Sequence, residues 1–243
     1  MQNVSRRTQL IIWGGIAAVA LVAVLLIATA GSGGGGFSFL GTSNEPTVTP
    51  GRQIVDADGT EVPVEQQDSV ADFTAAYGEP AGTDFARLRI PAIGVDAPVG
   101  NWFVDGPVMQ EPYGPVDVAF YDLSNFSGLG GYPGAGQNAV FGGHVDLNRD
   151  VAYAGDHYRG PAVFWALDQL TPGTIIEVEY NGQLLEYSVM WVEHLEASDA
   201  TNWRQYWSSD VPVDSITLFT CGGEFDFESL SYSHRTVVRA ERI

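Results

Sequence analysis

The chain has 243 residues, with 30 acidic side chains against 11 basic ones, all of them arginine, and a formal net charge of −19 at pH 7. Nucleic-acid binding depends on Lys and Arg side chains that neutralise phosphates, so this composition argues against a nucleic-acid partner. It argues equally against an anionic membrane surface as a ligand.

The first predicted element is an apolar run at residues 10–30, which contains no charged side chain. About 20 apolar residues suffice for a helix that crosses a membrane, and Arg6 and Arg7 place residues 1–9 on the cytoplasmic side. We therefore expect a transmembrane signal anchor at 10–30, with the rest of the chain outside the cell. The alternative is a signal peptide cleaved after residues 28–30, although the run is long for such a peptide. Both alternatives export the remainder of the chain.

Residues 31–82 are expected to form a flexible extracellular linker. The first part is rich in Gly, Ser, Thr and Pro, a composition typical of tethers. Residues 52–82 are polar and acidic and show no sustained hydrophobic period. Residues 83–243 are then long enough for one domain with a sizeable core.

The domain at 83–243 is predicted to be mainly β. Apolar and β-branched runs predict strands at 87–90, 96–99, 138–145, 174–180, 183–195, 215–221 and 234–243. The Asn181-Gly182 pair between two of these runs indicates a hairpin with a type I′ turn. One or two helical turns are expected at 162–170 and again at 198–207. Short strands separated by turn signals favour a barrel or a sandwich.

The only cysteine, Cys221, ends a predicted strand and is followed by two glycines. In an exported chain an odd cysteine is buried, intermolecular or reactive. A reactive thiolate needs a proton partner and a cationic neighbour. His144 is the candidate partner, because it follows Gly142 and Gly143 at the end of a strand, where glycines allow close approach.

The other three histidines are weaker candidates. His157 is expected in a solvated loop, His194 alternates with hydrophobic residues and would face solvent, and His234 opens the last strand. A buried structural cysteine remains the competing interpretation of Cys221 at this point.

These segments resemble the sortases, exported and membrane-anchored transpeptidases found mainly in Gram-positive bacteria. The "TLFTC" at 217–221 is similar to their T-L-x-T-C signature, and "NAVFGGHV" is similar to the segment that ends in the catalytic histidine. The likeness extends to "RLRIPAIGVDAPV", "GPAVFWALDQLTPGTIIEVEYNGQLLEYSV" and "SHRTVVRA", and so covers residues 85–243. The "TCGGEFD" continuation most resembles class F, with class E second. Thr174 departs from the family, which often has Asp after the turn glycine, but it lies in a turn.

The resemblance implies an eight-stranded β-barrel with short helices behind one N-terminal transmembrane helix. It implies Cys221 as nucleophile, His144 as acid and base, and Arg235 as the arginine that stabilises the oxyanion. Arg239 competes with Arg235, because period-2 geometry puts both on one strand face. Thr220 matches the motif threonine, which would shape the strand end and support the substrate.

The activity that the resemblance implies is cleavage of an L-P-x-T-G-like sorting signal between Thr and Gly through a thioacyl enzyme. The partners would be surface proteins bearing that signal and an amine of the peptidoglycan precursor. No cofactor is expected, and one Cys with four scattered His gives no metal-ligand spacing. Calcium binding by acidic loops is left open.

Three other classes of protein remain as alternatives. An L,D-transpeptidase would have an arginine two residues after the thiol, where Gly223 stands. A papain-like protease would have its cysteine at the start of a helix, whereas Cys221 ends a strand. A non-catalytic all-β surface module would need neither the histidine nor the cysteine segment.

Overall fold

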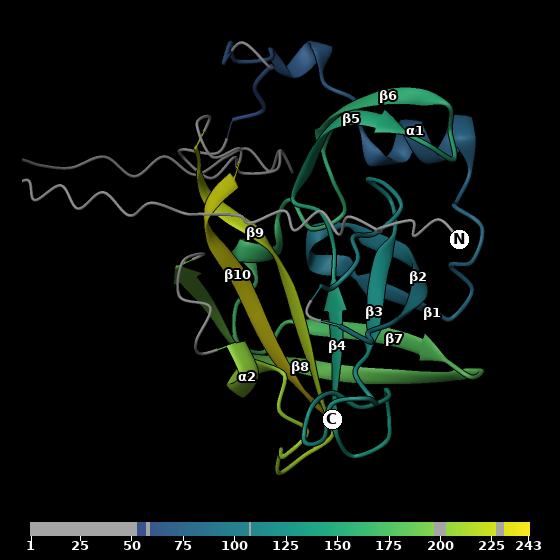
Figure 1. Ribbon diagram of the computed structural model, residues 1–243, viewed down its shortest axis with the longest axis vertical. Helices are drawn as coiled ribbons and strands as arrows, with labels where there is room; N and C mark the ends of the chain where they lie inside the picture. The colour runs from purple at the N-terminus through teal and green to yellow at the C-terminus, as the bar shows by residue number, and fades with distance from the viewer. Residues whose placement is uncertain (1–52, 57–58, 107, 197–202, 227–230) are drawn as a thin grey trace, which may run out of the picture. The chain divides into compact units, whose positions relative to one another are not determined.

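The computed structural model describes residues 53–56, 59–106, 108–196, 203–226 and 231–243. Its centre is a closed barrel with the strand order β1-β2-β3-β4-β9-β10-β8-β7 (Figure 1). The predicted mainly β, eight-stranded barrel with short helices is therefore confirmed. The expected transmembrane segment at 10–30 lies outside the described residues. Within the described part, no helix is both long and apolar enough to span a membrane.

The barrel strands pair antiparallel except at two places, where β2 lies parallel to β3 and β4 lies parallel to β9. Their bounds are β1 Ala86–Ile90, β2 Val95–Phe103, β3 Val118–Asp122, β4 Asn138–Gly142, β7 Ile175–Tyr180, β8 Gln183–Glu196, β9 Ser215–Asp226 and β10 Ser231–Arg242. A second sheet is a two-stranded ribbon of β5 (Asp146–Val151) and β6 (Asp156–Pro161).

Apolar side chains from alternate strand positions fill the barrel, among them Leu88, Phe120, Phe141, Ile216 and Leu218. This is the period-2 burial that one packed face of a strand requires. The β7–β8 hairpin turns at Asn181 and Gly182, whose φ angles of 51° and 73° are those of the predicted type I′ turn.

The two regions expected to be helical are shorter than the sequence ranges. The first contains the 3-10 turn η3 (Leu167–Gln169), and the second contains α2 (Trp203–Tyr206). Residues 198–202 of the second range lie outside the described residues. Another 3-10 turn, η2 (Pro91–Ile93), follows β1 and ends at Gly94, whose φ of 68° is left-handed.

Part of the range expected to be linker is folded, which corrects the boundary at residue 83. The 3-10 turn η1 (Val64–Gln66) and the helix α1 (Val70–Tyr77) lie in it, and α1 packs against the β5–β6 ribbon (Figure 1). Ser69 caps the helix by accepting a hydrogen bond from the Asp72 backbone amide at 3.1 Å. Phe73 is the one buried residue of α1 and stacks edge-on against Tyr158 of β6. A single buried ring per helix gives no detectable period, so the sequence pattern does not predict this element.

Candidate active site

Cys221 lies on the outer face of β9, near the end of the barrel. Ile216 and Leu218 point into the barrel core, so the alternate positions Thr217, Phe219 and Cys221 belong to the opposite face. Cys221 is half-buried. Its thiol can therefore meet a substrate that approaches from outside the barrel.

Arg235 is the direct cross-strand partner of Cys221 in the antiparallel β9–β10 pair. Cross-strand partners share one face, with Cβ atoms about 4.5–5.5 Å apart. The Nη1 of Arg235 donates a hydrogen bond to the carbonyl of His234 at 3.0 Å, and the side chain is half-buried.

Arg239 lies on the same face, four residues further along β10 and opposite Thr217. Its guanidinium donates to Thr217 Oγ1 at 3.1 Å and to the Tyr206 carbonyl at 2.8 Å. It also lies over the ring of Trp191, 5.6 Å from the centroid. These contacts engage Arg239 in packing α2 against the barrel, whereas Arg235 is the arginine next to Cys221.

His144 reaches the same end of the barrel from β4. Gly142 pairs with Phe219 in the parallel β4–β9 ladder, so His144 and Cys221 each lie two residues beyond one paired position. The backbone of Gly143 is bonded twice to β9: its amide donates to the Phe219 carbonyl at 3.3 Å, and its carbonyl accepts from Thr220 Oγ1 at 2.8 Å. The buried Thr220 thus holds the residue that precedes His144.

The two glycines before His144 permit the close packing expected of them. A Cβ on Gly142 would lie 2.8 Å from the Tyr121 ring, and one on Gly143 would lie 2.6 Å from the Phe164 ring. Both distances are shorter than real Cβ contacts. Larger residues would push the histidine segment away from β9.

The imidazole of His144 has two neighbours that the sequence did not indicate. Arg149 of β5 places Nη2 3.3 Å from His144 Nε2, and the same guanidinium binds Glu111 at 2.7 Å through Nη1. The backbone of Pro112 acts on the ring as well and favours its protonated form. Burial first, and then the Arg149 charge, lowers the pKa of His144 to about 4, while Glu111 and Pro112 act in the opposite direction. The ring is therefore neutral at pH 7.

A family model described as a sortase domain matches residues 88–243, well over half of the chain. The chain belongs to the sortase family. It is accordingly a cysteine transpeptidase, and the family takes substrate proteins with a sorting signal and joins them to a cell-wall amine.

This sortase is also similar to solved structures of the family. Sortase A of Corynebacterium diphtheriae, a lid mutant, is 23% identical over 66% of this chain and 70% of that chain, with a TM-score of 0.46. Sortase C-1 of Actinomyces oris is 20% identical over 81% of this chain and 91% of that chain, with a TM-score of 0.45. No curated protein matches the sequence.

The remaining histidines of the sortase lie elsewhere in the fold. His157 is exposed on β6, not in a loop as expected, and its ring nitrogens lie 2.8 Å from Asp150 and 3.0 Å from Asn148. His194 is exposed on β8, as predicted. His234 contacts Ser233 at 2.7 Å and lies 3.4 Å from Glu196.

The loop between β2 and β3, which carries Glu111 and Pro112, is tied down by two buried groups. Asp117 is fully buried and accepts hydrogen bonds from the backbone amides of Tyr113 and Gly114, each at 2.8 Å. Burial raises the pKa of Asp117 to about 6 despite these amides. Tyr121 donates to the Gln110 carbonyl at 2.8 Å. Its pKa is raised, first by burial and then by the charges of Glu111, Asp117 and Cys221.

Sequence reasoning missed Glu111, Arg149, Asp117 and Tyr121 because none belongs to a motif. Arg149 was hidden for a further reason: β5 has too few apolar residues to predict a strand. Among the residues described, no three His, Cys, Asp or Glu side chains come together as a metal site.

Proposed function

We propose that this sortase uses Cys221, His144 and Arg235 to cleave an L-P-x-T-G-like sorting signal between Thr and Gly. The observation that carries the proposal is the cross-strand pairing of Cys221 with Arg235, with His144 at the end of the neighbouring parallel strand. These registers support a site in which thiol, cation and imidazole lie on neighbouring strands at one end of the barrel, the three groups that acyl transfer through a thioester needs.

The reaction has two balanced steps. The Cys221 thiolate adds to the Thr carbonyl, and Arg235 donates hydrogen bonds to the oxygen that becomes negative. The C–N bond then breaks, the leaving Gly amine takes a proton from His144, and a thioacyl enzyme remains. An incoming cell-wall amine adds to the thioester, gives its proton to His144, and expels Cys221 as thiolate. One amide bond is exchanged for another, so no oxidant or reductant is needed.

We further propose that residues 10–30 anchor the enzyme in the cell membrane with its catalytic domain outside, and that the enzyme is of class F, with class E second. The apolar run preceded by Arg6 and Arg7 supports the first proposal, and the "TCGGEFD" continuation supports the second. The acceptor would be an amine of the peptidoglycan precursor.

The test of the reaction uses the full-length protein and a panel of fluorogenic peptides that vary the second and third positions of L-P-x-T-G, with and without an added primary amine. We expect cleavage between Thr and Gly, a mass adduct on Cys221 equal to the acyl fragment, and an amine-dependent transfer product. The Cys221→Ala variant should fold and form neither adduct nor product. Cleavage at another bond, or turnover by Cys221→Ala, would refute the mechanism.

The test of localisation is separate. Removal of residues 1–30 should release the protein from the membrane fraction, and protease added to intact cells should digest the catalytic domain of the full-length protein. A domain protected from external protease would contradict the proposed orientation.

A further inference from the structure

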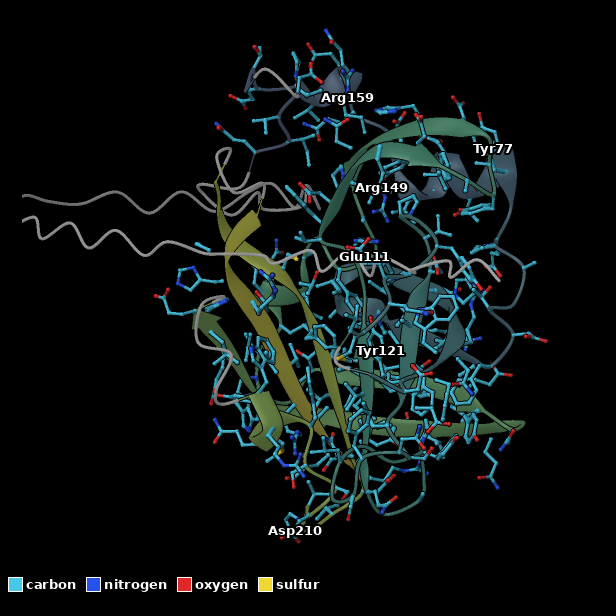
Figure 2. The ribbon with its side chains drawn as sticks, in the orientation of Figure 1. Tyr77, Glu111, Tyr121, Arg149, Arg159 and Asp210 are labelled. Atoms are coloured by element: carbon cyan, nitrogen blue, oxygen red, sulfur yellow. The ribbon has the colours of Figure 1, made fainter. Side chains whose placement is uncertain are left out.

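The half-buried histidine of the active site lies beside a pair of oppositely charged side chains from two different elements. Arg149 comes from the β5–β6 ribbon and Glu111 from the loop between β2 and β3, and Figure 2 shows both in the space between ribbon and barrel. The same guanidinium contacts Glu111 at 2.7 Å and His144 Nε2 at 3.3 Å. One guanidinium therefore contacts both the Glu111 carboxylate and the His144 imidazole.

The contact with Arg149 determines which ring nitrogen of His144 carries the proton. A guanidinium is only a donor, so Nε2 must offer its lone pair to Arg149. A neutral imidazole carries one proton, so with Nε2 accepting from Arg149 the proton must lie on Nδ1. The surroundings thus select the neutral tautomer with its proton on Nδ1.

The two charges act on this ring in opposite directions. Arg149 disfavours a second proton on the imidazole, and Glu111 favours one. The other ionisable groups near this end of the barrel are Cys221 on β9, Arg235 on β10 and Tyr121 on β3. Arg149 and Glu111 are the two charged side chains whose effects on the pKa of His144 are established.

The elements that carry the pair are held in place independently of it. On the ribbon side, the Asp68 amide donates to the Arg159 carbonyl at 2.8 Å, the Arg159 amide donates to Asp68 Oδ2 at 2.7 Å, and Phe73 packs on Tyr158. On the loop side, Asp117 binds two backbone amides. Loss of either charge should therefore leave the backbone around His144 where it is.

We propose that Arg149 and Glu111 are positioning residues that set the protonation of His144: Arg149 holds the ring neutral with its proton on Nδ1, and Glu111 holds Arg149 and moderates its charge. This rests on the proposed role of His144 as acid and base. Protonation of the leaving amine needs the imidazolium, which carries a proton on Nε2 as well. The hydrogen bond between Arg149 and His144 Nε2 must therefore break when substrate enters. The pair therefore governs the fraction of enzyme that is ready to protonate the leaving amine.

The test is NMR of the full-length protein with ¹⁵N-labelled histidine, in which the His144 signals are identified by their loss in His144→Gln. In the wild type, Nδ1 should carry the proton at pH 7 and Nε2 should not. Arg149→Met should raise the His144 pKa by about one unit or more, and Glu111→Gln should lower it. Arg149→Lys keeps the positive charge, so the rise of the His144 pKa in this variant should be at most half of the rise in Arg149→Met.

Arg159→Met is the matched control, because Arg159 lies on the same ribbon and pairs with Asp56 at 2.9 Å. It should leave the His144 pKa unchanged. A purely structural ion pair predicts that Arg149→Met and Glu111→Gln change the pKa in the same direction or not at all. Either result, or a wild-type proton on Nε2, would overturn the proposal. The readout needs no turnover, so it stands or falls separately from the reaction proposed above.

The two variants Arg149→Met and Glu111→Gln should also have opposite effects on kcat/KM near neutral pH. If thiolate and imidazolium must coexist, the active fraction rises with the His144 pKa. Glu111→Gln should then lose several-fold in kcat/KM, and Arg149→Met should lose nothing or gain. A several-fold loss in both variants would contradict this control of protonation.

Discussion

At the scale of single residues, two arginines on one face of β10 have different surroundings. Arg235 lies opposite Cys221, whereas Arg239 binds the Tyr206 carbonyl and Thr217 and covers Trp191. Sequence periodicity puts both on the same face and distinguishes them only by motif register. The cross-strand register supplies the distinction directly.

We expect Arg235→Ala and Arg239→Ala to fail in different ways. Arg235→Ala should lose about 10²-fold or more in kcat/KM, because an oxyanion donor is gone, while its urea midpoint stays near the wild type. Arg239→Ala should lose about 2 kcal/mol of unfolding free energy, because hydrogen bonds from a charged, partly buried donor are removed. Steady-state kinetics and urea denaturation on both variants check this. An inactive, stable Arg239→Ala would reverse the assignment.

Thr220 offers a second prediction at this scale. Its hydroxyl donates to the Gly143 carbonyl at 2.8 Å, so it positions the His144 segment whether or not it also meets substrate. Thr220→Val keeps the shape but not the donor, and we expect about a tenfold loss in kcat, equivalent to roughly 1.4 kcal/mol. Thr220→Ser should stay close to the wild type. A rise in KM with kcat unchanged would instead indicate uniform substrate binding.

At the scale of elements, the N-terminal segment and the β5–β6 ribbon form one structural unit. Gly160 of β6 lies so close to Asp68 that an added Cβ would be 2.2 Å from the Asp68 carbonyl oxygen. The segment before α1 thus packs against β6 at a position where only glycine leaves enough space. The β5–β6 ribbon also contains Arg149, which contacts His144. The ribbon therefore links the Asp68–Gly160 contact to the active site.

Gly160→Ala should displace the segment around Asp68. Backbone atoms cannot yield as a flexible side chain would, so we expect faster hydrogen exchange at residues 59–77 and a lower unfolding midpoint. Gly106→Ala is the matched control, because a Cβ there meets nothing within 4 Å. Unchanged exchange in Gly160→Ala would show that the segment is not seated through this contact.

At the scale of the whole molecule, the buried Asp117 and the half-buried His144 oppose each other in the pH dependence of stability. The pKa of Asp117 is raised to about 6, so the folded state binds this proton more tightly than the unfolded state. The free energy of unfolding therefore falls as pH rises from about 4 to 6. The pKa of His144 is lowered to about 4, so the unfolded state binds this proton more tightly. Its contribution rises with pH between about 4 and 6.5.

These contributions should largely cancel in the wild type and separate in variants. Asp117→Asn removes the falling contribution, so its unfolding free energy should rise more steeply with pH than that of the wild type between pH 4.5 and 6. His144→Gln removes the rising one, so its slope should be lower than wild type. Urea denaturation at several pH values checks both signs. Equal slopes in all three proteins would show that neither group titrates as the surroundings require.

The sequence predicted much of the molecule because its signals are local. The Asn181-Gly182 turn, the alternation in β1, β7 and β8, and the T-L-x-T-C and G-H segments each lie within a few residues. The barrel followed from the family resemblance. The strand β3 escaped prediction because four of its five residues are buried, so both faces are covered and no alternation remains.

Local signals therefore determined the mainly β class and the candidate pair Cys221 and His144, since strand alternation, turn chemistry and reactive side chains are properties of short stretches. The eight-stranded barrel and Arg235 came from the resemblance of those stretches to the sortases. Only the tertiary structure decided which side chains surround the histidine. Arg149 and Glu111 are 38 residues apart and lie in a polar ribbon and an irregular loop. Their contact depends on α1, which packs against the ribbon, and on Asp117, which holds the loop through two backbone amides. An ion pair of this kind leaves no periodic trace in a sequence, because it depends on the distance between two side chains in the folded chain.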